Sequence, residues 1–156
     1  MAPRDWICNM AITTSPKSAI LVDDELHNAT WLLDYLYSKK LDVITAETAN
    51  EALELLEREI HRIAIIDLRI PVLPPIEQLI FSHGESYAKF PGLYVAESAR
   101  NKGYRDRQVI LYSVHREREV ADIAERLRIS YIMKGRPQEI KREIESVLSF
   151  DPTRAK

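Results

Sequence analysis

Five polar side chains of this sequence could together carry out phosphoryl transfer. They comprise three carboxylates, one hydroxyl and one amine, and each stands at the end of a short apolar run: Asp23, Asp24, Asp67, Ser113 and Lys134. Carboxylates brought within ~4 Å of one another repel by about 4 kcal/mol per pair at an effective dielectric constant of about 20. A hard divalent cation with oxygen ligands removes that repulsion, and Mg²⁺ is the expected ion.

The residue types suggest a chemical role for each member of this set. With Asp67 as the nucleophile, the cation and Lys134 can neutralise charge on the transferring oxygens, and Ser113 can hold one of them. Any one of these residues taken singly is more often a turn former or a helix cap. Their joint occurrence at the ends of the first, third, fourth and fifth apolar runs favours a function.

The elements that must position these residues are predicted by the hydrophobic pattern. From Ser18 onward, short apolar runs alternate with longer amphipathic stretches, which predicts βα units. Runs without a polar face suit central strands covered by helices on both faces, so we expect an α/β fold with a doubly wound five-stranded parallel sheet. Its first and third strands are neighbours, and the three aspartates then converge at the carboxyl ends. The expected strands are 19–22, 43–46, 63–66, 109–112 and 131–133.

Five stretches with apolar residues three and four positions apart are predicted helices. Thr48 or Asn50 can cap the start of the second helix. Gly92 starts the third helix, Gly103 stops it, and Pro137 suits the first turn of the last helix. The expected helices are 27–39, 49–60, 92–102, 117–127 and one beginning at 137.

The remaining segments define the expected domain organisation. Residues 1–17 are predicted to form a flexible N-terminal arm, 18–150 the domain, and 151–156 a tail. Within the domain, residues 72–90 form an inserted loop after the third strand, with one short helical turn expected at 76–81. Loops of this length in compact domains are usually functional or disordered.

Length and composition exclude several classes of protein. The 156 residues, 46% hydrophobic and 29% charged, suffice for one core. The 22 basic and 24 acidic residues are mixed and give a net charge of −2, which provides no basis for a nucleic-acid partner. The start does not resemble a signal peptide, and no run approaches the ~20 apolar residues of a membrane span. We therefore expect a cytoplasmic protein with no membrane or nucleic-acid partner.

Four motifs resemble the receiver domain of two-component response regulators, whose fold is that of the chemotaxis receiver protein. Each motif is weak alone, but the four occur in order at the expected strand ends. The resemblance covers about residues 18–150 and implies a flavodoxin-like sheet with strand order 2-1-3-4-5. The motifs are LVDDE (21–25), IIDLRIP (65–71), ILYSV (110–114) and YIMKGRP (131–137).

The resemblance implies a phosphorylation site at Asp67 with a bound magnesium ion. Asp24 and Asp67 would bind Mg²⁺ directly, and Asp23 would act through water or as a base. The backbone carbonyl of Arg69 would supply a further ligand.

The resemblance also implies a conformational switch and its partners. Ser113 resembles the switch hydroxyl that moves toward the phosphoryl group, Tyr131 the aromatic residue that turns inward with it, and Lys134 the phosphate-binding lysine. A sensor histidine kinase or a phosphotransfer protein would donate the phosphoryl group, and an unknown output protein or a homodimer would respond to it. Such a domain catalyses only its own phosphorylation and dephosphorylation and is not otherwise an enzyme.

The sequence departs from the receiver pattern at several positions around the site. Gly135 and Arg136 separate Lys134 from Pro137, and we expect a trans bond after Lys134 because a cis bond without proline costs about 2.5 to 4 kcal/mol. Val114 stands where a small residue is usual. The loop after Asp67 has about 17 extra residues compared with the family. One hypothesis is that this loop restricts small phosphodonors.

Two other functions remain open from the sequence. A degenerate receiver would keep the fold as a phosphorylation-independent interaction module, which the interrupted lysine loop favours and the intact acidic set opposes. A phosphatase of the haloacid dehalogenase type would need a second aspartate two residues after the nucleophile, where Arg69 stands. The receiver interpretation therefore leads.

Overall fold

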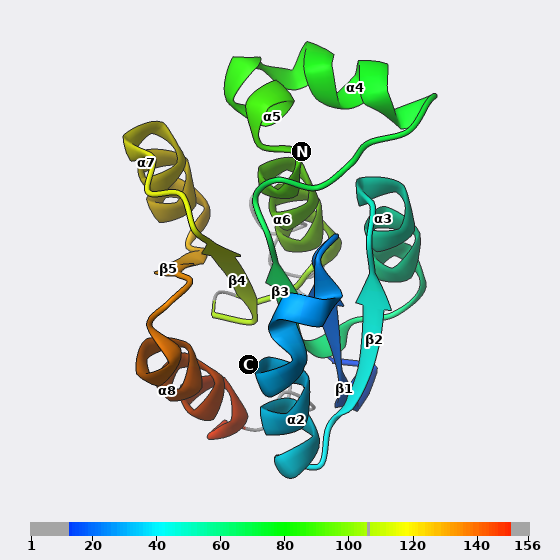
Figure 1. Ribbon diagram of the computed structural model, residues 1–156. Coiled ribbons are helices and arrows are strands. Elements are labelled where there is room, and N and C mark those ends of the chain that lie inside the picture. The colour runs from blue at the N-terminus through cyan, green and yellow to red at the C-terminus, as the bar shows by residue number, and fades with distance from the viewer. Residues whose placement is uncertain (1–12, 106, 151–156) are drawn as a thin grey trace.

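The computed structural model describes residues 13–105 and 107–150 (Figure 1). Five strands form one sheet in the order β2-β1-β3-β4-β5, and every neighbouring pair is parallel. This confirms the predicted fold class and strand order. The strands are β1 (Ser15–Val22), β2 (Asp42–Ala46), β3 (His61–Ile66), β4 (Val109–Ser113) and β5 (Ser130–Met133).

Helices cover both faces of this sheet because alternate strand residues point to opposite sides. In β3, Ile63 and Ile65 pack with α2 and α8, whereas Ala64 and Ile66 pack with α3, α6 and α7. All four side chains are fully buried, and burial of one such isoleucine contributes about 1.5–3 kcal/mol. The helices are η1 (Leu26–Ala29), α2 (Thr30–Ser38), α3 (Ala49–Arg58), α4 (Ile76–His83), α5 (Glu85–Lys89), α6 (Pro91–Lys102), α7 (Arg118–Leu127) and α8 (Pro137–Leu148).

Local signals explain several helix boundaries. Thr48 caps α3, since its hydroxyl accepts a hydrogen bond from the backbone N–H of Glu51 at 3.1 Å. Gly103 ends α6 in the left-handed conformation, as its position in the sequence indicates. The first predicted helix is divided between η1 and α2, and Arg58 ends α3 two residues before the expected position.

Gly92 brings the start of α6 directly onto the end of β3. A Cβ atom at this position would lie 1.9 Å from the carbonyl oxygen of Asp67, and the Gly92 N–H donates to the carbonyl of Leu68 at 2.9 Å. No side chain fits at that separation, so glycine is required here. The backbone of Asp67 is thereby held against α6.

The inserted segment 72–90 is more ordered than the single helical turn expected for it. It contains two helices, α4 and α5, which lie beyond the ends of α3, α6 and α7 (Figure 1). Ile80, Tyr87 and Phe90 are buried and anchor the segment. The side-chain amide of Asn50 both donates to and accepts from the backbone of Leu73, at 3.0 and 2.8 Å. The insertion is therefore packed onto the domain at both ends.

The first strand begins at Ser15, four residues before the predicted start at residue 19. The expected N-terminal arm therefore does not extend to residue 17. Ser15 pairs with His61 of β3, and the Ser18 hydroxyl lies 2.5 Å from His61 Nδ1. The polar sequence of this stretch gives no strand signal, because its stability comes from contacts with β3. The rest of the expected arm (1–12) and the expected tail (151–156) lie outside the described residues. Within the described ranges, no helix is long and apolar enough to cross a membrane.

Candidate functional site

The three aspartates lie together at the carboxyl edge of the sheet. Val22 of β1 pairs with Ile66 of β3, so Asp23 and Asp67 follow paired positions, with Asp24 next to them. Carboxylate oxygens of the three residues lie within 4.8 Å of one another. Asp23 is buried, Asp67 is partly buried and Asp24 is exposed. The strand register thus produces the acidic cluster that the sequence suggested.

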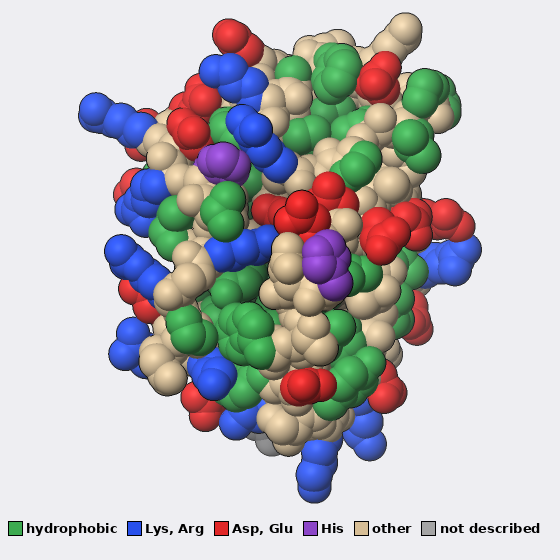
Figure 2. Space-filling model, viewed as in Figure 1, with side chains coloured by type: hydrophobic (Ala, Val, Ile, Leu, Met, Phe, Trp, Pro, Cys, Tyr) green, Lys and Arg blue, Asp and Glu red, His purple; other side chains and the backbone are tan. Residues whose placement is uncertain are grey.

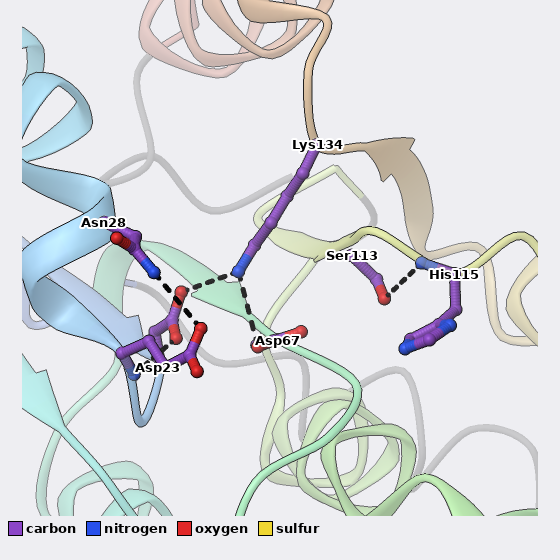
Figure 3. Close-up of polar contacts among 7 residues, drawn as sticks. Asp23, Asn28, Asp67, Ser113, His115 and Lys134 are labelled. Atoms are coloured by element: carbon purple, nitrogen blue, oxygen red, sulfur yellow. Dashed lines mark hydrogen bonds and ion pairs between the residues drawn. The ribbon is translucent and has the colours of Figure 1, made fainter.

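Lys134 reaches into this cluster from the end of β5 (Figure 3). Its Nζ donates to Asp23 Oδ2 at 2.8 Å and to Asp67 Oδ2 at 3.4 Å. Burial opposes the charge on Lys134, but the hydrogen bonds and charges of the two aspartates outweigh it and raise its pKa. The bond after Lys134 is trans, as predicted, since the only cis bond in the described ranges joins Pro74 and Pro75.

The ionised carboxylate of Asp67 is disfavoured in this environment. Burial is the largest influence on Asp67, and the neighbouring charges of Asp23 and Asp24 act in the same direction. Lys134 opposes them incompletely, so the pKa of Asp67 rises to about 6. A cation bound to the cluster would relieve this strain.

Ser113 at the end of β4 and Tyr131 of β5 both bind the backbone of the loop that follows β4. The Ser113 hydroxyl is fully buried and accepts a hydrogen bond from the His115 N–H at 3.1 Å. In Figure 3, Lys134 extends toward Asp67, whereas the Ser113 hydroxyl points toward the backbone of His115. The Tyr131 hydroxyl donates to the carbonyl of His115 and accepts from the Glu117 N–H at 3.0 Å. Tyr131 therefore fixes the backbone of the loop that carries Ser113.

Arg69 lies two residues after Asp67 and is exposed. Its guanidinium carbon lies 5.6 Å from the ring centroid of Phe90, the residue that precedes α6. Arg69 and Asp24 both line a hollow of about 410 Å³ whose far wall belongs to the insertion. A role for the Arg69 backbone carbonyl as a metal ligand stays a prediction.

The insertion forms one wall of the hollow that Asp24 and Arg69 line. Figure 2 shows acidic side chains gathered at the surface near the strand ends, with basic side chains beside them. Val114, which stands where a small residue is usual, is 64% exposed and lines a second hollow of about 200 Å³ with Asp23 and Lys134. The hypothesis that the loop restricts small phosphodonors stays a prediction.

Sequence reasoning missed several residues that hold the site in place. The Glu25 N–H donates to Asp23 Oδ1 at 2.8 Å, and the Asn28 side chain donates to the Glu25 carboxylate at 3.2 Å. The ring of Tyr112 lies 5.9 Å from Lys134 Nζ. Glu25 directly follows Asp23 and Asp24 in the motif LVDDE, and this position was the one sequence signal for its role. The contacts of Tyr112 with Lys134 and of Phe90 with Arg69 could not be predicted from the spacing of residues in the sequence.

The donor set at the cluster fits a hard divalent cation. It consists of carboxylate oxygens from three aspartates, which are the ligands that Mg²⁺ prefers. Their mutual repulsion and the raised pKa of Asp67 both favour a bound positive charge. Asp23, Asp24 and Asp67 are accordingly the residues that would hold Mg²⁺.

Comparisons with known proteins identify the fold. No protein-family model and no curated protein sequence matches the chain. Solved receiver domains match it closely in structure. A CheY-like response regulator receiver domain from Methanospirillum hungatei is 22% identical, with 86% of this chain and 95% of that chain covered and a TM-score of 0.62. The response regulator TrrA from Thermotoga maritima, solved with Mg²⁺ and beryllofluoride, is 24% identical, with 85% and 99% covered and a TM-score of 0.62.

A third solved structure has the same fold at lower identity. The beryllofluoride-activated receiver domain of RstA from Klebsiella pneumoniae is 15% identical, with 85% of this chain and 99% of that chain covered and a TM-score of 0.63. Since the alignments include almost the whole of these domains, the chain has the complete receiver fold.

Proposed function

We propose that this chain, which has the receiver fold, accepts a phosphoryl group on Asp67 with the help of Mg²⁺ and changes its binding surface in response. One observation carries the proposal: Asp23, Asp24 and Asp67 lie within 4.8 Å of one another, and Lys134 contacts two of them. Carboxylate nucleophile, metal ligands and a fixed cation are what phosphoryl transfer to aspartate requires.

In the proposed reaction, a carboxylate oxygen of Asp67 attacks the phosphorus of the donor. A bond forms between that oxygen and phosphorus, the bond from phosphorus to the leaving group breaks, and the leaving group departs with the electron pair. Lys134 balances negative charge on the phosphoryl oxygens, and the Ser113 hydroxyl can donate to one of them. Mg²⁺, when bound by the aspartates, would neutralise further charge at the same oxygens.

The receiver fold suggests the setting of this reaction. A sensor histidine kinase or a phosphotransfer protein is the proposed donor, and the output is a change in affinity for another protein or a second copy. A ligand-driven change from a 1:99 to a 99:1 population needs about 5.5 kcal/mol of differential stabilisation. We propose no catalytic activity beyond the protein's own phosphorylation and dephosphorylation. A cytoplasmic location stays a prediction.

Mass spectrometry of the intact protein tests the proposal directly. After treatment with acetyl phosphate and Mg²⁺, the wild type should gain the mass of one phosphoryl group, and Asp67→Ala should gain none. Asp34→Ala removes an exposed carboxylate of α2 and should be labelled like the wild type. Labelling of Asp67→Ala to the same extent as the wild type would show that the acceptor lies elsewhere.

Beryllofluoride binding distinguishes this function from that of a degenerate receiver. The anion with Mg²⁺ mimics the phosphoryl group on an aspartate, so it should stabilise the wild type and leave Asp67→Asn unaffected. The interrupted lysine loop, with Gly135 and Arg136 after Lys134, is the feature that favours a phosphorylation-independent module. Absence of both binding and labelling would support that module.

A further inference from the structure

The helices α3 and α6 lie side by side on one face of the sheet and leave a groove between them (Figure 1). Its volume of about 520 Å³ exceeds that of either hollow beside the acidic cluster. Part of its lining is apolar and accessible to solvent, which suits an apolar ligand. The apolar lining consists of Leu53, Ile76 and Tyr94, which are partly exposed, and of the buried Leu56.

The charged side chains that line this groove already have partners. Glu57 of α3 forms an ion pair with Lys102 of α6, across the groove. Glu54 forms an ion pair with Arg58, one turn further along α3. These charges therefore do not call for an ionic ligand, and the partly exposed apolar lining favours an apolar segment as the occupant.

The residues that follow the N-terminal segment 1–12 lie beside one end of the groove. The Thr14 N–H donates to the carbonyl of Ile60 at 3.0 Å, and the Ile60 N–H donates to the Thr14 hydroxyl at 2.9 Å. Ile60 lies only three residues after Glu57, which lines the groove, so Thr14 is within roughly 15 Å of Glu57. The segment 1–12, which lies outside the described residues, thus joins the domain next to the groove.

The segment 1–12 has the length and composition to occupy the groove. Eight of its twelve residues are hydrophobic, and only Arg4 and Asp5 are charged. Twelve residues span about 40 Å when extended, whereas the part of α3 that lines the groove, residues 50–57, is about 10 Å long. The largest side chain of the segment is Trp6, whose apolar ring gains most from burial.

We propose that the groove between α3 and α6 binds the segment 1–12 of the same chain, with the ring of Trp6 on the apolar lining beside Leu53. The rim offers hydrogen-bond acceptors for the indole N–H in the side chains of Ser98 and Asn101. This groove is separate from the acceptor site, so neither function depends on the other.

Fluorescence of Trp6 tests the occupant. Trp31→Phe leaves Trp6 as the only tryptophan of the chain. The docked indole should be quenched by acrylamide about three- to fivefold less than in the same protein unfolded in urea, because burial protects the ring. In this background, Ser98→Arg should raise the quenching constant about two- to fourfold, since its long side chain is attracted to Glu54 and Glu57 and fills the groove.

Two further variants control for the added charge and for folding. Ser38→Arg makes the same substitution at the exposed end of α2, on the opposite face of the sheet, and should leave the quenching constant unchanged. Asn101→Arg fills the groove from an exposed position of α6 and should act like Ser98→Arg. Far-ultraviolet circular dichroism compares the folding of the variants, and the two groove variants provide independent tests.

A nitroxide label on Cys8, the only cysteine of the chain, locates the segment. Amide signals of α3 and α6 in nuclear magnetic resonance spectra should be broadened more than those of α2 and α8. Ser98→Arg should abolish this difference. A mixture of nitroxide-labelled protein with isotope-labelled protein that lacks the nitroxide detects docking between copies, and the isotope-labelled signals should not be broadened.

The outcomes distinguish this occupant from others. Protection of Trp6 that both groove variants abolish, with broadening of α3 and α6 within one molecule, would support the proposal. Quenching of Trp6 equal to that of the unfolded chain would refute it, and so would protection that neither groove variant changes. Broadening in the mixed sample would show that a second copy supplies the segment and would also refute it. None of these results bears on phosphorylation of Asp67, which mass spectrometry tests separately.

Discussion

Replacing Asp67 by asparagine should stabilise the metal-free protein. The pKa of Asp67 is raised from 3.8 to about 6, so the ionised carboxylate is disfavoured in the folded state. One pKa unit corresponds to about 1.4 kcal/mol, and the difference of about two units gives about 3 kcal/mol at pH values above 6. Asp67→Asn should raise the free energy of unfolding by this amount, because the amide has a similar shape to the carboxylate and carries no charge.

The direction of the pH dependence follows from the raised pKa. The cost of the Asp67 charge is fully present above the folded pKa of about 6 and disappears as pH falls below the unfolded value of 3.8. The stability difference between Asp67→Asn and the wild type should therefore be about 3 kcal/mol near pH 7.5, about half of that near pH 5, and close to zero near pH 3.5.

Urea unfolding with a metal chelator measures this difference at each pH. Added Mg²⁺ should stabilise the wild type more than Asp67→Asn and so reduce the difference, because a ligand stabilises the state that binds it. Asp34→Asn, an exposed aspartate of α2, is the control and should change stability by less than about 0.5 kcal/mol. An Asp67→Asn variant less stable than the wild type at pH 7.5 without metal would refute the proposed strain.

Four further substitutions test the supports of the site. Gly92→Ala should destabilise the protein by about 2–4 kcal/mol and slow labelling, because the new Cβ would lie 1.9 Å from a backbone oxygen. Gly135→Ala meets no atom within 4 Å and should cost only about 1 kcal/mol, because its φ is positive. Urea unfolding compares the stabilities of the two variants. Glu97→Gln should weaken the 2.5 Å hydrogen bond between Glu97 and His83 by about 1 kcal/mol and lower hydrogen-exchange protection of α4 and α5, and unchanged protection would contradict this attachment. Lys134→Met should destabilise the metal-free protein by about 3 kcal/mol, because a buried aspartate loses its partner, and Mg²⁺ should restore part of the loss in thermal unfolding.

The sheet and the acidic cluster were predictable because their signals are local. The runs at 63–66 and 109–112 are apolar throughout, and a parallel sheet necessarily brings the residues after such runs to one edge. Asp67 lies beside Asp23 because β3 pairs with β1 and not with β2, an order that chain order alone does not give. The α/β class and the residues of the cluster therefore came from pattern and spacing, whereas the strand order came from the family resemblance.

The features that escaped prediction depend on contacts between distant parts of the chain. The strand at Ser15 is polar in sequence and exists through its bonds to β3. Asn50 was one of two candidate caps for α3, but its side chain binds the backbone of Leu73 instead. Phe90 lies far from Arg69 in the sequence and meets it only after the insertion has folded. The hydrophobic periodicity of the sequence gives no signal for contacts between residues so far apart in the chain.

The contact between Leu68 and Gly92 brings the two ends of the intervening segment together. Because the N–H of Gly92 donates to the carbonyl of Leu68 at 2.9 Å, the chain leaves and re-enters the domain at one point. The length of the segment therefore matters little, since doubling the length of a loop costs only about 0.6 kcal/mol. Its buried side chains matter more, and a foreign peptide displayed beside Asp67 in place of residues 69–91 would have to supply the packing of Ile80 and Phe90.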